Sequence, residues 1–66
     1  MERLLNYGPH QITATVLNLM GQDLVRIKTI VNVHRVYCDV PAASAGDALK
    51  YLEQLDAKTA WGLLIG

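Results

Sequence analysis

The stretch from residue 24 to residue 40 constrains the fold more than any other part of the sequence. It contains neither glycine nor proline and is rich in the β-branched residues that favour strands. Apolar and polar side chains alternate along it, and the alternation changes phase once; the apolar positions are Val25, Ile27, Val31 and Val33, then Val36, Cys38 and Val40. Because strand side chains alternate between two faces, a phase change indicates a bulge or a break. We expect two strands or one bent strand, with the irregularity near His34 and Arg35.

One further strand is expected before this stretch. Residues 11–20 are rich in threonine and other β-branched side chains, which predicts a strand. Residues 21–23 are expected to form a hairpin loop, because the glycine there can adopt a positive φ. Residues 1–7 are expected to form one helical turn or an extended arm. Gly8 and Pro9 end that segment, since proline lacks an amide donor and disfavours helix in the residue before it.

One helix is expected over residues 45–55. Ser44 and Asp47 have the spacing of a capping box, with aspartate in place of the usual glutamate or glutamine. The apolar stripe of this helix is formed by Ala45, Ala48, Leu49, Leu52 and Leu55. Residues 59–65 are apolar and are expected to form a last strand, with Trp61 in the core beneath the helix.

The expected element order is β-β-(β)-α-β, in a single domain that covers residues 1–66. Strand–helix–strand connections cross over with the right hand and make their two strands parallel. The sequence therefore predicts an α+β fold, with a small mixed sheet and one helix packed on one face. The other face of the sheet is expected to remain uncovered.

Composition excludes several functional classes. The 66 residues carry six lysines and arginines and six aspartates and glutamates, so the formal net charge is zero. This balance argues against a generic polyanion binder, a cationic membrane peptide and an acidic DNA mimic. Charged residues make up only 18% of the chain and hydrophobic ones 52%, which indicates a folded protein.

The single cysteine, Cys38, allows no internal disulfide and favours a reducing compartment. No apolar run reaches the roughly 18 residues of a transmembrane helix, and the first residues lack the apolar core of a signal peptide. We therefore expect a cytoplasmic protein that does not bind membranes.

Candidate chemical groups are few. The residues that could be considered as metal ligands are His10, His34, Cys38 and Asp39. In one strand His34 and Cys38 would lie about 13 Å apart, too far to share a zinc ion. Cys38 also lies in an alternating valine strand, where a small core residue is expected rather than a nucleophile. The sequence holds no glycine-rich phosphate loop. We expect no metal, no cofactor and no enzymatic activity.

Positive charge is concentrated in residues 24–38, which contain no acidic residue, while residues 39–58 are mildly acidic. Tyr37 lies among these cations, and Tyr51 projects from the flank of the helix, where a rigid aromatic suits an interface. The expected partner-binding residues are Arg26, Lys28, His34, Arg35, Tyr37 and Tyr51.

A chain of this length buries only about 60% of its unfolded surface, so stabilisation by a second subunit is expected. Leu17, Leu19 and Met20 are not buried by the expected fold, and we predict that they support a homodimer. The leading hypothesis is a non-enzymatic protein–protein interaction module. In size and composition it resembles small phage-encoded inhibitors and regulatory subunits. Two alternatives remain open: a β-ribbon that binds nucleic acid through the same cations, and a protein that holds a small anionic ligand near them.

Overall fold

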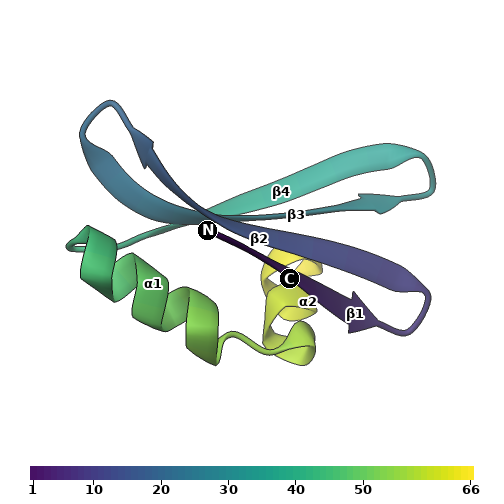
Figure 1. The fold of residues 1–66 in the computed structure, drawn as a ribbon. Coiled ribbons are helices and arrows are strands. Elements are labelled where there is room, and N and C mark those ends of the chain that lie inside the picture. The colour runs from purple at the N-terminus through teal and green to yellow at the C-terminus, as the bar shows by residue number, and fades with distance from the viewer.

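The computed structural model describes residues 1–66 and shows a four-stranded antiparallel sheet followed by two helices (Figure 1). The elements are β1 (Glu2–Tyr7), β2 (His10–Leu19), β3 (Gln22–Val31), β4 (His34–Pro41), α1 (Ala45–Gln54) and α2 (Ala57–Ile65). Each strand pairs with the next one along the chain, in the order β1-β2-β3-β4. The α+β class is confirmed. The mixed sheet is not, because every strand pair is antiparallel.

All three hairpins have two-residue loops with a positive φ at the first position. Met20–Gly21 joins β2 to β3, one residue before the predicted loop, so the residues after Gly21 already belong to β3. Asn32–Val33 joins β3 to β4, with φ values of 49° and 62°. Positive φ at both central residues is typical of type I′ turns, which match the twist of the strands. Valine is an unusual occupant, because a β-branched side chain is strained in this region.

These two-residue loops explain the change of phase in the sequence. Val31 pairs with His34, so odd-numbered residues of β3 lie opposite even-numbered residues of β4. Val25 therefore faces the same side of the sheet as its partner Val40. Of the two expected arrangements, the structure shows two strands and not one bent strand; the break between them is a tight turn at residues 32–33, just before the expected position at His34 and Arg35.

The core lies between one face of the sheet and both helices (Figure 1). Its buried members are Leu5, Ile12, Ala14, Val25, Ile27, Ala48, Leu52, Leu55 and Ala60. The prediction of α1 is confirmed: the Ser44 Oγ accepts a hydrogen bond of 3.1 Å from the backbone N–H of Asp47. Ser44 thereby satisfies one of the first-turn amides that a helix leaves without a partner.

The predicted last strand is wrong, because residues 59–65 belong to α2. Asp56 begins this helix by accepting a 2.7 Å hydrogen bond from the Thr59 N–H, and the bond holds the pKa of Asp56 below its ordinary value. The right-handed crossover therefore does not exist, and two helices cover the sheet instead of one. Neither helix has the length and apolar character that would let it span a bilayer.

The first residues are extended, which is one of the two expected arrangements, and they pair with β2 as the edge strand β1. The guanidinium of Arg3 reaches across to the end of α1, where Nη1 donates to the carbonyl oxygens of Leu52 at 2.5 Å and Leu55 at 2.9 Å. A third carbonyl, that of Glu53, lies 3.0 Å from the same nitrogen. The last turn of α1 has no basic residue of its own, so Arg3 supplies the positive charge that favours a helix C-terminus.

Candidate functional site

The face of the sheet turned away from the helices, here called the open face, has no covering layer (Figure 1). At the end near the β2–β3 turn most of its side chains are apolar, with Gln22 as the polar exception. Leu17 pairs with Leu24, and Leu24 pairs in turn with Pro41. Leu24 is only 5% exposed, whereas Met20 at the turn is 99% exposed. We call Leu17, Leu19, Met20, Leu24 and Pro41 the apolar end of the open face.

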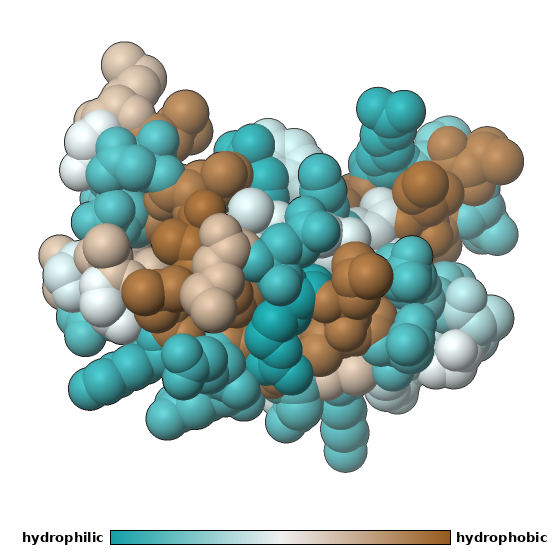
Figure 2. All heavy atoms as spheres, viewed as in Figure 1, coloured by the Kyte–Doolittle hydropathy of each residue, from teal (hydrophilic) through white to brown (hydrophobic).

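Figure 2 shows how the exposed apolar side chains are distributed in the same view as Figure 1. Hydrophobic atoms gather near the β2–β3 turn and again near the β3–β4 turn, with hydrophilic side chains between the two groups. The exposed apolar residues of these two regions are Leu19, Met20, Ile30 and Val33. The hydrophobic surface in this view is therefore divided and does not form one continuous patch.

The middle of the open face holds an ion pair. The Arg26 guanidinium donates to both carboxylate oxygens of Asp39, from Nε at 2.8 Å and from Nη2 at 2.9 Å, across the β3–β4 pair. These bonds hold the pKa of Asp39 below its ordinary value and raise the pKa of Arg26. The guanidinium carbon also lies 4.9 Å from the ring centre of Tyr37, within the range of a cation–π contact. Arg26 therefore has its counter-ion within the sheet.

The other two cations of the open face have no such partner. Lys28 pairs across the sheet with Tyr37, and Arg35 pairs with Ile30. The only salt bridge in the structure is that of Arg26, so Lys28 and Arg35 are free to meet an external anion. We call Lys28, Ile30, Arg35 and Tyr37 the basic end of the open face.

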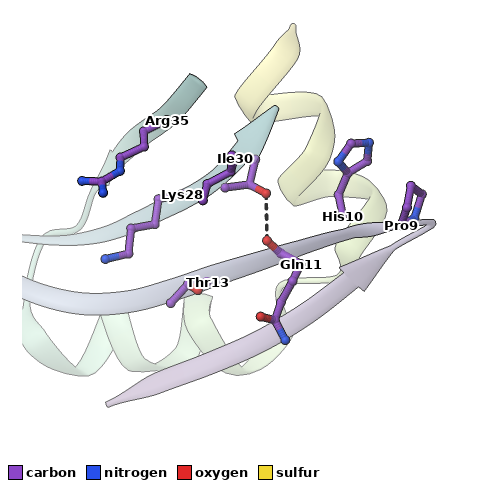
Figure 3. A pocket seen from close by; sticks show the side chains of 8 residues that line it. Pro9, His10, Gln11, Thr13, Lys28, Ile30 and Arg35 are labelled. Carbon is purple, nitrogen blue, oxygen red and sulfur yellow. Dashed lines mark hydrogen bonds between the residues drawn. The ribbon is translucent and has the colours of Figure 1, made fainter. Parts of the chain in front are cut away.

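Between the basic end and the β1–β2 turn the sheet splits. The pairing of β2 with β3 stops at Thr13–Lys28, although β3 and β4 stay paired as far as their own turn. Beyond that point the Thr29 hydroxyl donates to the Gln11 carbonyl oxygen at 2.8 Å (Figure 3). The split leaves a depression of about 610 Å³, here called the notch, which is lined by Pro9, His10, Gln11, Thr13, Lys28, Thr29, Ile30 and Arg35. No carboxylate lines it.

At the β1–β2 turn, beside the notch, three aromatic rings stack on one another. The His10 ring stacks on the Trp61 indole with ring centres 4.3 Å apart, and the Tyr7 ring stacks on the same indole at 5.6 Å. Tyr7 and His10 flank the β1–β2 turn, so these contacts attach that turn to α2. Trp61 was predicted beneath the helix in a strand; it lies instead on α2 and remains partly exposed.

The structure places four of the six predicted partner-binding residues together on the open face, namely Arg26, Lys28, Arg35 and Tyr37. His34 does not join them, because it pairs with Val31 and its strand position is on the helix side of the sheet. Tyr51 lies on α1, also on the helix side, where it packs against the core. Burial raises the pKa of the Tyr51 phenol, and the nearby thiol of Cys38 adds to this effect.

The residues considered as metal ligands do not converge. Asp39 faces the open side with Arg26, whereas Cys38 pairs with Ile27 on the helix side. His10 is stacked on Trp61. No group of three or more histidine, cysteine, aspartate or glutamate side chains could hold a metal ion.

Sequence reasoning missed Asp39 as the partner of Arg26, and it missed the notch. A two-residue turn at positions 32–33 would have placed residue 26 opposite residue 39, but valine at position 33 hid that turn. The notch depends on where the β2–β3 pairing ends, which no local pattern indicates. No protein-family model matches this chain, and no match is found among curated proteins or solved structures. The open face and the notch are therefore the features that bear on function.

Proposed function

We propose that this protein is a non-enzymatic protein-binding module that uses the open face of its sheet as the binding surface. The observation that carries the proposal is the packing of both helices on one side, which leaves exposed apolar groups beside unpaired cations on the other. Tyr37 is 65% exposed and Ile30 60% exposed, and Lys28 and Arg35 lie next to them. Tyrosine and arginine are enriched among the residues that contribute most to protein interfaces.

The chemistry of the basic end indicates the kind of partner. Lys28 and Arg35 have no carboxylate of their own chain to meet, while the Arg26–Asp39 pair between the basic end and the apolar end is already neutral. A partner with acidic side chains around an apolar centre would complement this arrangement. Charges of this kind act mainly on association rate and on the choice of partner. The single thiol, Cys38, favours a reducing compartment, so we place this binding in the cytoplasm.

We also propose that the apolar end supports a homodimer. Leu19 and Met20 are exposed there next to Leu17 and Leu24, and the chain has no disulfide to stabilise a small core. Light scattering on a size-exclusion column at about 10 µM, where an interface of micromolar affinity is populated, should give twice the mass of the chain. Leu17→Ser with Leu19→Ser should give a monomer. A wild-type chain that elutes as a monomer refutes the dimer.

Partner binding is tested by reversing the free charges of the open face. Lys28→Glu with Arg35→Glu should abolish capture of the partner from lysate of the native host, as read by mass spectrometry. The matched control is Lys50→Glu with Lys58→Glu, which makes the same change in net charge on exposed positions of the two helices. Circular dichroism establishes that both variants are folded. Equal capture by the two variants would contradict the assignment to the open face.

Nucleic-acid binding is a weaker candidate, because Arg26 is held by Asp39 and only Lys28 and Arg35 remain to contact phosphates. Two phosphate contacts would give a logarithmic salt dependence of about −2 on duplex DNA. A fluorescence-anisotropy titration against salt therefore separates the two candidates. Tight duplex binding with a steeper slope would replace the protein-binding proposal.

A further inference from the structure

The notch is built mainly on strands, and of its lining residues only Pro9 lies in a turn. Its walls are the diverging ends of β2 and β3, which remain paired to β1 and β4 on their outer sides. The Thr29 side chain is buried, and its hydroxyl bridges the two strands by donating to the Gln11 carbonyl oxygen. This bond satisfies a backbone carbonyl at the point where the ladder ends. The backbone on both sides of the notch is therefore held in place by strand pairing and by the Thr29–Gln11 bond.

The charge in the notch is not neutralised. Lys28 and Arg35 come from adjacent strands, and their side chains extend in the same direction (Figure 3). No acidic residue lines the notch. Of the open-face carboxylates, Asp39 is bound to Arg26, and Glu2 lies on β1 opposite Thr15, outside the notch, and forms no salt bridge. The Thr13 hydroxyl lines the same end and can donate a further hydrogen bond. A guanidinium, an ammonium and a hydroxyl together are the donors that proteins use for phosphate groups.

The notch is larger than one phosphate group needs. Its volume of about 610 Å³ lies within the range of small-ligand pockets. At the end away from Lys28 and Arg35 it is lined by Pro9 and His10 (Figure 3). The His10 ring itself stacks on Trp61 at the helix side of the sheet, and the notch beside Pro9 and His10 has room for the body of a ligand. A ligand with a phosphate at one end and a polar ring at the other would reach both ends.

We propose that the notch binds a small organic phosphate of mononucleotide size. The phosphate lies against Lys28, Arg35 and Thr13, and the rest of the ligand extends along Ile30 toward His10. This site goes beyond the proposed protein binding, although it shares Lys28 and Arg35 with it. It also requires His10, which the protein-binding proposal does not use.

The test is a titration of the ¹⁵N-labelled chain followed by NMR. Adenosine monophosphate should give saturable shifts at the amides of Thr13, Lys28 and Arg35, with a dissociation constant below about 1 mM. Adenosine, which lacks the phosphate, should bind at least about tenfold more weakly. Inorganic phosphate, which lacks the ring, should shift the same amides and also bind more weakly. No saturable shift with adenosine monophosphate, or equal binding of adenosine, overturns the proposal.

Neutral variants locate the site. Lys28→Gln with Arg35→Gln should weaken binding of adenosine monophosphate by about tenfold or more. Lys50→Gln with Lys58→Gln removes the same charge from the helices and should leave the affinity unchanged. His10→Ala should weaken the nucleotide but not inorganic phosphate. An equal loss in the helix control means that only net charge matters, which refutes a site in the notch.

Two further measurements distinguish nucleotide binding in the notch from nucleic-acid binding and from the proposed protein binding. A twelve-nucleotide single strand that binds more than about a hundredfold tighter than the mononucleotide, with steep salt dependence, indicates a nucleic-acid surface and overturns the small-ligand proposal. Leu17→Ser with Leu19→Ser should leave nucleotide binding intact even where it abolishes self-association. If the wild-type chain captures no partner but still binds adenosine monophosphate, the protein-binding proposal alone is refuted.

Discussion

Replacing Arg3 by methionine should destabilise the protein much more than the same change at Arg35. Arg3 lies on β1, and its Nη1 reaches carbonyl oxygens at the C-terminal end of α1. Those oxygens have no further turn of helix to bind, because α1 ends at Gln54. Methionine keeps most of the apolar stem of arginine, so the substitution removes mainly the charge and the hydrogen bonds.

The size of the effect follows from the contacts. One guanidinium nitrogen carries two protons, so two of the three close carbonyl oxygens are counted as accepting full bonds. Hydrogen bonds to a charged group contribute about 1.5–3 kcal/mol each when well buried, and these are partly exposed. With about 0.5 kcal/mol for the loss of a cation at the helix C-terminus, we expect about 2–4 kcal/mol in all. For a domain of this size that lowers the melting temperature by roughly 10–25 °C.

The assay is urea and thermal denaturation followed by circular dichroism. Arg35→Met is the matched control, because Arg35 forms no salt bridge in the structure, and it should change the free energy of unfolding by less than about 0.5 kcal/mol. Arg3→Lys should fall between wild type and Arg3→Met, since an ammonium keeps the charge but cannot reproduce the geometry of the guanidinium. If Arg3→Met and Arg35→Met unfold at the same urea concentration, the contact does not hold β1 to α1.

Three other changes test separate parts of the fold. Val33→Gly should raise the free energy of unfolding by about 1 kcal/mol, because glycine adopts the φ of 62° without strain; an unchanged urea midpoint would show that the turn is unstrained. Ser44→Ala should lower it by about 1 kcal/mol, whereas Ser44→Asn, which also caps helices, should have little effect; equal losses would contradict the capping role. The pKa values of Asp39 and Asp56 lie below their ordinary values, so these groups stabilise the fold above about pH 4, and that stability is lost as the pH falls through their folded pKa values. The melting temperature should therefore be nearly constant from about pH 7 to pH 5 and should decrease below about pH 4. The decrease should be smaller in Asp39→Asn. If that variant and the wild type show the same decrease in acid, Asp39 does not contribute to it.

Local sequence signals predicted α1, β2 and the extended stretch that forms β3 and β4, because each has its own pattern; they did not predict β1 as a paired strand. The cap at Ser44 and the apolar stripe after it suffice for the helix. In β3 and β4 the alternation of apolar residues marks the buried face. The failure at residues 59–65 has an equally local cause. This segment is apolar nearly all round, so its helical period is hidden by exposed residues such as Leu63 and Ile65.

A signal for α2 was nevertheless present. Ala57, Ala60, Trp61 and Leu64 have the i, i+3, i+4, i+7 spacing of a helix, and they are the α2 residues that lie in or pack against the core. Asp56 directly before them is a favoured N-cap residue. No local pattern could predict the contact of Arg3 with Leu52 and Leu55. The residues of these two contacts are separated in the sequence by 49 and 52 positions. The notch is likewise a property of how two hairpins diverge.

The connection of each strand to its immediate neighbour in the chain has a consequence for the route of folding. Contacts between neighbouring hairpin strands close short loops, and chains dominated by such contacts fold faster than those with distant strand pairing. Hairpins form within about 1–10 µs, so the β2–β3 hairpin, with its two ten-residue strands, is the expected nucleus. The bonds from Arg3 to the end of α1 connect residues that are 49 and 52 positions apart in the sequence. Because they close such a long loop, they should form after the transition state. Loss of Arg3 would then accelerate unfolding and leave the refolding rate nearly unchanged.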